Sequence, residues 1–202
     1  MNATVNMEKY TDNNGRMHPK KFALMLLIIG MTMLFAGLTS AFLVRHAEGN
    51  WDGFKLPSQF VYSTVTVVIG SLTMFGALKS AQRDNLRSVQ VLLAITLLMG
   101  VAFTYLQFQG FADMAARGYY FVPSEGGANG TISGSFVIML IGLHLLHLLG
   151  GVVFLTVVLV KSLMLKVHKK NTLSISMCNT YWHFVGLLWL YLYLFLYFVH
   201  QV

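Results

Sequence analysis

The chain has 202 residues, of which 56% are hydrophobic and only 10% are charged. A typical soluble domain is about 25% charged, so this chain has too few charged side chains to cover a water-facing surface. Composition therefore excludes an ordinary soluble globule. It also argues against a nucleic-acid partner, although the net charge is +7.

Five stretches of the chain contain no Asp, Glu, Lys or Arg, and they are 23, 19, 23, 30 and 23 residues long. About 20 helical residues cross the roughly 30 Å hydrocarbon core of a bilayer. Inside lipid every backbone amide must be hydrogen-bonded within its own segment, so each stretch is predicted to be a helix. The predicted fold is all-α, a polytopic membrane protein with a bundle of five transmembrane helices. The predicted spans are about residues 22–44, 60–78, 89–111, 131–160 and 177–199.

The domain organisation is predicted to be simple, with a polar tail at residues 1–21 and a single five-helix membrane domain at residues 22–202. The first stretch is too long for the apolar part of a signal peptide, so we do not expect it to be cleaved. The fourth stretch is longer than an upright span needs. We expect it to tilt, or residues 130–135 to lie at the membrane surface. The single cysteine, Cys178, excludes an intrachain disulfide.

The distribution of Lys and Arg predicts the orientation, because cytoplasmic connections carry an excess of these residues. The N-terminal tail and the connections after the second and fourth stretches hold 4, 3 and 4 of them. The opposite side holds only Arg45, Lys55 and Arg117. The N-terminus is therefore predicted to be cytoplasmic and the C-terminus external.

Three of the cytoplasmic cations, Lys79, Arg83 and Arg87, recur every four residues. A short helical continuation of the second span would point all three toward anionic lipid headgroups, which attract juxtamembrane basic residues. The simpler interpretation is that they act only as a topology signal.

Small and weakly polar side chains at helical spacing predict where the helices touch, because helix packing in lipid needs close approach and interhelical hydrogen bonds. Such residues form one stripe on each of the first three spans. The stripes are Gly30 and Gly37; Thr66, Gly70, Thr73 and Ala77; and Thr96, Gly100, Thr104 and Gln107.

Three histidines lie within the last two spans, and an ionisable group in a membrane marks a function or a buried partner. His144 and His147 are three residues apart and share a helix face, while His183 lies on the next helix. A metal or haem site, a proton relay, and hydrogen bonding to neighbouring helices or lipid headgroups are the three alternatives. The spans contain no carboxylate to complete a di-iron or zinc site or a relay. Hydrogen bonding is therefore favoured.

The last span also holds an unusual density of aromatic residues, beginning at Tyr181 and Trp182 and continuing to Phe198. Trp and Tyr favour the membrane interface because each has an apolar body and a polar tip. Here the rings run through the whole span, which suggests packing against another protein or against ordered lipid.

Two motifs in these spans resemble subunit III of haem–copper terminal oxidases, the cytochrome c oxidase subunit III family. The family shows a G-x-H-x-x-H-x-x-x-G pattern on its penultimate helix and Y-W-H-F-V-D-x-V-W on its last. The residues that match are Gly142, His144, His147, Gly151, Tyr181, Trp182, His183, Phe184, Val185 and Trp189. The pair Leu106-Gln107 and the basic connection at residues 79–87 are also similar to family features.

This sequence departs from the family at three acidic positions. The Asp of the last motif is Gly186 here, a Glu after the Leu-Gln pair is replaced near Gly110, and a membrane-embedded Glu would fall near Thr32. The family commonly has seven helices, so the chain resembles a five-helix bacterial form that lacks the first two. The cleft in which relatives bind lipid, between those two helices and the rest, would be open or completed by another subunit.

The resemblance implies an accessory subunit of a respiratory oxidase in the bacterial cytoplasmic membrane, with no redox centre or active site of its own. The haems and copper would sit in partner subunits I and II, and this chain would pack on subunit I. It would support assembly, bound phospholipid and sustained proton uptake. The resemblance places His144, His147, His183, Trp182 and Gln107 at contacts with helices, lipid or subunits.

Two other functions remain as alternatives. One is a stand-alone haem- or metal-binding membrane protein that uses His183 with His144 or His147. The other is a small transporter, for which the sequence offers neither paired intramembrane charges nor repeats with broken helices.

Overall fold

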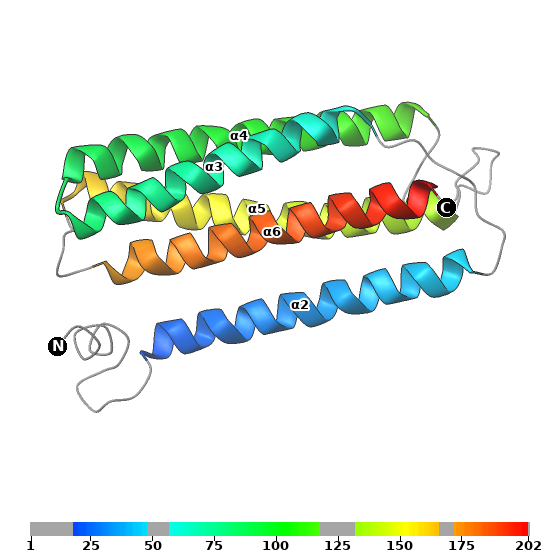
Figure 1. Cartoon of the computed structure of the whole chain (residues 1–202), viewed down its shortest axis with the longest axis horizontal. Coiled ribbons are helices and arrows are strands. Elements are labelled where there is room, and N and C mark those ends of the chain that lie inside the picture. Colours follow the sequence, from blue (N-terminus) through cyan, green and yellow to red (C-terminus); the bar gives the residue numbers. More distant parts are fainter. Residues whose placement is uncertain (1–17, 48–56, 118–131, 166–171, 202) are drawn as a thin grey trace.

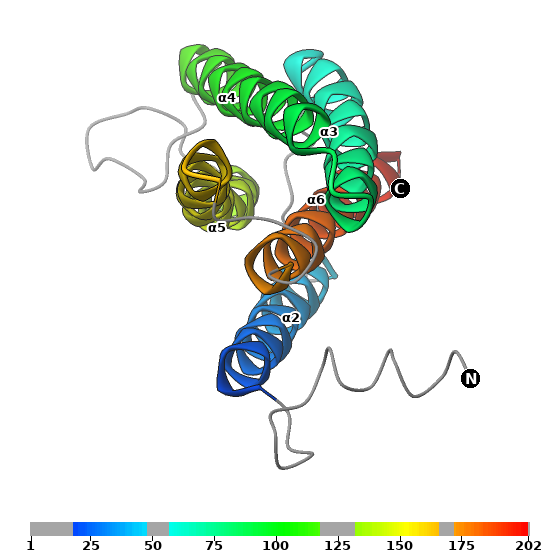
Figure 2. The same ribbon diagram turned by 90° about the vertical axis from the view of Figure 1, so that its left-hand side faces the viewer.

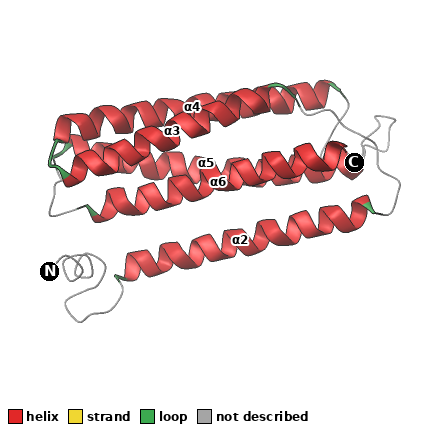
Figure 3. Cartoon of the chain, in the orientation of Figure 1, coloured by secondary structure: helices red, strands yellow, loops and turns green. Residues whose placement is uncertain are grey.

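Five long helices make up the fold in the computed structural model, which describes residues 18–47, 57–117, 132–165 and 172–201 (Figures 1 and 3). The helices are α2 Pro19–His46, α3 Gln59–Gln82, α4 Leu86–Ala116, α5 Ile132–Leu163 and α6 Leu173–Gln201. All five are long and apolar enough to cross a membrane. They contain the five predicted spans, apart from residue 131, which lies outside the described residues. The prediction of a polytopic five-helix bundle is thus confirmed.

The helix ends follow from local sequence. Pro19 stands at the start of α2, where its missing N–H costs no hydrogen bond, so this helix begins inside the predicted tail. Asn85 caps α4 by accepting a hydrogen bond from the Ser88 N–H at 3.3 Å. Asp84 has a φ of 60°, which turns the chain sharply between α3 and α4.

That turn corrects one prediction. A helical continuation that carries Lys79, Arg83 and Arg87 on one face does not form, because α3 ends at Gln82 and Asp84 takes the left-handed conformation. The three side chains nevertheless lie at the same end of the α3–α4 hairpin, and all three are exposed.

Four helices form a closed ring, and the fifth lies outside it. Contacts join α3 to α4, α4 to α5, α5 to α6, and α6 back to α3. Among the described helices, α2 touches only α5 and α6, and the end-on view shows it beyond α6 (Figure 2). The ring holds buried side chains of all four helices, with Trp189, Phe103 and Leu140 among the largest.

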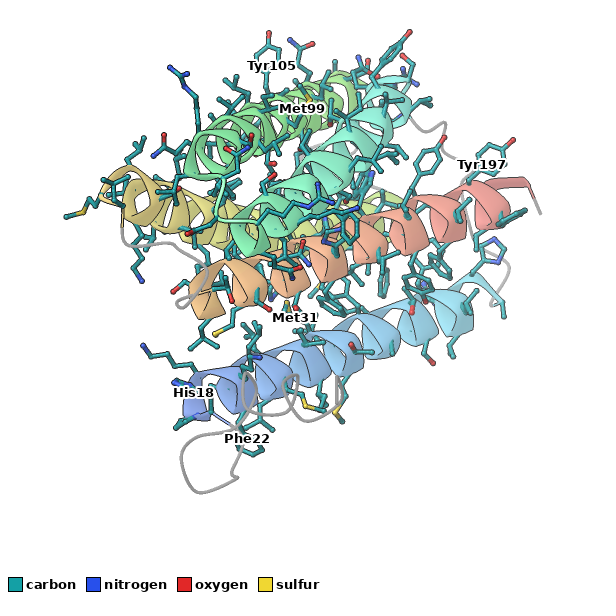
Figure 4. The ribbon with its side chains drawn as sticks, turned by 60° about the vertical axis from the view of Figure 1, so that its left-hand side comes forward. His18, Phe22, Met31, Met99, Tyr105 and Tyr197 are labelled. Carbon is teal, nitrogen blue, oxygen red and sulfur yellow. The ribbon has the colours of Figure 1, made fainter. Side chains whose placement is uncertain are left out.

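Helix α2 contacts the ring through one stripe of buried residues, Met31, Phe35, Thr39 and Phe42. Met31 points toward α6, whereas Phe22 points away from the bundle (Figure 4). The Thr39 hydroxyl also lies 3.0 Å from the Tyr191 hydroxyl of α6.

The predicted contact faces are confirmed on α3 and α4 but wrong on α2. The Thr73 and Thr96 hydroxyls are hydrogen-bonded at 2.8 Å between α3 and α4. Gly30 and Gly37, in contrast, are exposed, and a Cβ at either would meet nothing within 4 Å. Large side chains on another face of α2 make its contacts instead.

Candidate functional site: an aromatic and polar centre between four helices

His144 of α5 is fully buried in the middle of the helix ring. Its imidazole lies against Trp189 of α6, with ring centroids 5.3 Å apart, and against Phe103 of α4 at 6.0 Å. Neither ring nitrogen has a hydrogen-bond partner. The imidazole therefore contributes here as a packed ring.

Trp189 is the residue on which the four helices converge. Its ring packs edge-to-face on Phe103 of α4, with centroids 5.2 Å apart, and on Phe60 of α3 at 5.7 Å, an arrangement that aromatic pairs prefer. Its indole N–H donates a hydrogen bond to the Thr64 hydroxyl of α3 at 3.0 Å. We call Phe60, Phe103, His144 and Trp189 the aromatic centre.

Gln107 forms a polar contact between α3 and α4 about one turn along α4 from Phe103. This fully buried side chain donates a hydrogen bond from Nε2 to the Ser63 hydroxyl at 3.1 Å. Ser63 in turn donates to the Phe60 carbonyl at 2.9 Å. The amide oxygen of Gln107 is buried without a partner, so the contact satisfies only part of the amide.

Trp182 lies one heptad before Trp189 and fits against glycines of neighbouring helices. A Cβ on Gly100 of α4 would lie 2.7 Å from Cη2 of this indole, and a Cβ on Gly70 of α3 would lie 3.5 Å from Cζ2. A side chain at Gly100 would therefore force the ring to shift, whereas a Cβ at Gly70 would only touch it. Gly100 in particular lets the Trp182 ring of α6 approach α4 closely.

The other two predicted histidines bond to their own helices. Nδ1 of His147 lies 2.7 Å from the Leu143 carbonyl, and Nδ1 of His183 lies 2.8 Å from the Asn179 carbonyl. His147 also packs against Phe35 of α2, with ring centroids 5.8 Å apart. A role for either in bonding another helix, a subunit or lipid stays a prediction.

The predicted site residues thus fall into separate places. His144 belongs to the aromatic centre, Gln107 and Trp182 lie at contacts between helices, and His147 and His183 are only partly buried. Within the described ranges, no three His, Cys, Asp or Glu side chains gather as a possible metal site. The arrangement of the described residues is suited to joining helices.

Sequence reasoning assigned no site role to the other members of this region. Phe60, Phe103 and Ser63 are apolar or small residues in apolar spans and carry no distinctive pattern. Trp189 offered two usable signals. It matches the motif of the last span, and it follows Trp182 by seven residues and so lies on the same face of α6.

Comparisons with known proteins agree with this architecture. A family model described as cytochrome c oxidase subunit III matches residues 9–201. The chain is 28% identical over 188 residues to cytochrome c oxidase subunit 3 of Oryctolagus cuniculus, covering 88% of this chain and 68% of that protein. It is 28% identical over 173 residues to the probable cytochrome c oxidase subunit 3 of Nocardia farcinica (83% and 81%), and 23% identical over 182 residues to that of Bacillus sp. strain PS3 (88% and 84%).

Proposed function

Because the chain belongs to the cytochrome c oxidase subunit III family, we propose that it serves a haem–copper respiratory oxidase as an accessory subunit without a redox centre of its own. The observation that carries this proposal is the extent of the family match, which runs from residue 9 to residue 201 and so through all five helices. In this proposal, residues 22–202 form one membrane domain.

The haems and copper belong to the partner subunits. This chain packs on the catalytic subunit I, in a complex that also holds subunit II, and supports assembly, bound phospholipid and sustained proton uptake. The complex lies in the cell membrane, with the N-terminus of this multi-pass chain on the cytoplasmic side. The buried aromatic centre supports such a role, because its rings fill the space between four helices where a cofactor-binding bundle would place ligands.

In this proposal, the predicted site residues make structural contacts. His144, His147, His183, Trp182 and Gln107 hold helices, lipid or the neighbouring subunit in place. Lys79, Arg83 and Arg87 face anionic headgroups, which fits their exposure at one end of the hairpin.

Purification of the affinity-tagged chain from its native membrane tests this function. We expect a haem–copper catalytic subunit to co-purify, and the haem absorption to stay with that subunit when the complex is dissociated. The matched variants His144→Ala, His147→Ala and His183→Ala should weaken retention in the complex without changing the haem spectrum. A Soret band on the separated chain, lost in one of these variants, would favour the stand-alone haem protein. Absence of a catalytic subunit would contradict the proposal.

A further inference from the structure

The buried apolar side chains that the structure describes in the helix ring fall into two groups. One group surrounds the aromatic centre and includes Leu140 and Leu148 of α5. The other group lies where α3 turns into α4, and it includes Leu155 and Val158 of α5. We call the part of the ring around the first group the far end, and the part around the second group the turn end.

Each ring helix passes from one group to the other once. The change falls between residues 67 and 74 of α3, 93 and 103 of α4, 148 and 155 of α5, and 181 and 182 of α6. Gly70, Gly100 and the pair Gly150-Gly151 lie within the first three of these intervals. Glycine therefore marks the boundary on three helices, and Trp182 marks it on α6.

Trp182 lies at the centre of this boundary. A Cβ at Gly100 would lie 2.7 Å from its Cη2 atom, one at Gly70 would lie 3.5 Å from Cζ2, and one at Gly151 would lie 3.9 Å from Cε3. The indole thus has a glycine of each of the other ring helices beside it. We call Trp182 and these three glycines the waist. Since glycine has no side chain to interlock with its neighbours, the helices can tilt here more easily than in the packed groups on either side.

Helix α5 is loosened at the waist by its hydrogen bonding. In an α-helix the His147 carbonyl accepts from the Gly151 N–H, and the Tyr181 hydroxyl of α6 donates to the same carbonyl at 2.8 Å. One turn earlier, the Leu143 carbonyl lies 2.7 Å from Nδ1 of His147. Two successive carbonyls therefore share their acceptor capacity with side chains, directly before two glycines. Helices bend at glycines and where a side chain enters the hydrogen-bond ladder.

Packing requires only one of these two glycines. A Cβ at Gly151 would lie 3.0 Å from Cε1 of Tyr181, which is a tight approach. A Cβ at Gly150 would meet only the Tyr181 hydroxyl, at 3.6 Å, which is an ordinary van der Waals contact. Gly150 is also exposed. Alanine would therefore fit at Gly150 and would hold α5 more firmly, because glycine weakens a helix relative to alanine.

We propose that the waist is a hinge, at which the far end and the turn end of the ring move as two units about Trp182 while α5 bends at Gly150-Gly151. The four helices stay packed together within each end, as in other motions of packed helix groups. The hinge also moves α2, because Phe35 of α2 packs on His147 just before the glycines, with ring centroids 5.8 Å apart. It arises from the packing of this chain and does not depend on a role in an oxidase.

Hydrogen–deuterium exchange of the full-length chain in lipid nanodiscs tests the hinge. We expect the amides of residues 147–152 to exchange faster than those of the α5 segments on either side. Gly150→Ala should slow this exchange about fivefold, the factor that corresponds to the helix preference of alanine over glycine. Gly142→Ala is the matched control, because Gly142 lies on the same helix outside the waist and a Cβ there meets nothing within 4 Å. It should leave exchange at residues 147–152 unchanged.

A second matched pair tests whether the two ends are separate units. Leu140 of the far end and Leu155 of the turn end are both fully buried on α5, so alanine at either position leaves a comparable cavity. Each variant should raise amide exchange about tenfold or more in its own end and much less in the other end. The glycine variants leave no cavity, so they decide the question even where a leucine variant fails to fold.

Three results would each overturn the hinge. The first is exchange at residues 147–152 that is no faster than in the flanking segments of α5. The second is equal slowing of that exchange by Gly142→Ala and Gly150→Ala. The third is an equal rise in exchange at both ends of the ring in Leu140→Ala and in Leu155→Ala, because the ring would then open as a single unit.

Discussion

The ring of Phe60 on α3 occupies the space that any side chain at Gly110 on α4 would need. A Cβ there would lie 2.9 Å from Cζ and 3.1 Å from Cδ1 of the ring, and closer still to Cε1. A glycine at this position is therefore a packing requirement of the aromatic centre.

Gly110→Ala should destabilise the protein by about 1–3 kcal/mol, the usual cost of inserting a methyl group into a packed core. Thermal denaturation in detergent measures the effect. Gly37→Ala is the matched control, because a Cβ at Gly37 meets nothing within 4 Å and alanine favours the helix. Combining Gly110→Ala with Phe60→Leu should recover part of the loss. If Gly110→Ala and Gly37→Ala had equal melting temperatures, the Phe60 ring would be able to move aside without loss of stability.

His144→Phe should be at least as stable as the natural chain, whereas His144→Ala should lose about 2–5 kcal/mol through the cavity that it leaves. The reason is that neither imidazole nitrogen has a hydrogen-bond partner, so phenylalanine keeps the packing and removes two unpaired polar atoms. Thermal denaturation of the two variants, made in parallel, tests this. Strong destabilisation by phenylalanine would instead reveal a hydrogen bond made by His144 in the assembled protein.

Ser63→Ala should cost about 1 kcal/mol, because it leaves the Nε2 donor of Gln107 buried and unpaired. Gln107→Leu should reduce stability less in the Ser63→Ala variant than in the natural chain, because in that variant the Gln107 amide has already lost its hydrogen-bond partner. A double-mutant cycle measures the coupling. We expect a coupling between about 0.6 and 1.7 kcal/mol, the range from the average to the largest hydrogen bonds measured between membrane helices. Additive effects would mean that the two side chains do not interact.

The predicted orientation can be tested with single cysteines at opposite ends of α3 and α4. Gln82 and Ala116 are exposed at the ends of these helices, and neither is charged, so replacing them leaves the basic residues intact. A membrane-impermeant maleimide applied to intact cells should label Ala116→Cys and should label Gln82→Cys only after lysis. The native Cys178 is 1% exposed and should react in neither case. The reverse pattern would place the N-terminus outside.

The spans could be predicted from sequence because the absence of charge over 19–30 residues has one physical solution in lipid. The α3–α4 contact was equally predictable, since Thr73 and Thr96 lie on stripes of small residues that permit close approach. The same rule was wrong for Gly30 and Gly37. Small residues permit a contact but do not require one, and in α2 the stripe of Met31 and Phe35 packs against the ring instead.

The aromatic centre could be predicted only in part. His144 stood out because an imidazole is costly in a membrane, but its neighbours are determined by the crossing of four helices, which no local pattern encodes. Phe60 and Phe103 are 43 residues apart in the sequence, and each is one of many apolar residues in its span.

Because α2 lies outside the closed ring, it is held less firmly than the four helices of the ring are held to one another. Each helix of the ring packs against two ring neighbours, so loosening one contact in the ring affects the others. Helix α2 depends on a single stripe and the Thr39–Tyr191 contact, so it can separate while the remaining helices stay together. Substitutions in that stripe should therefore change the position of α2 before they change the melting temperature of the four-helix ring.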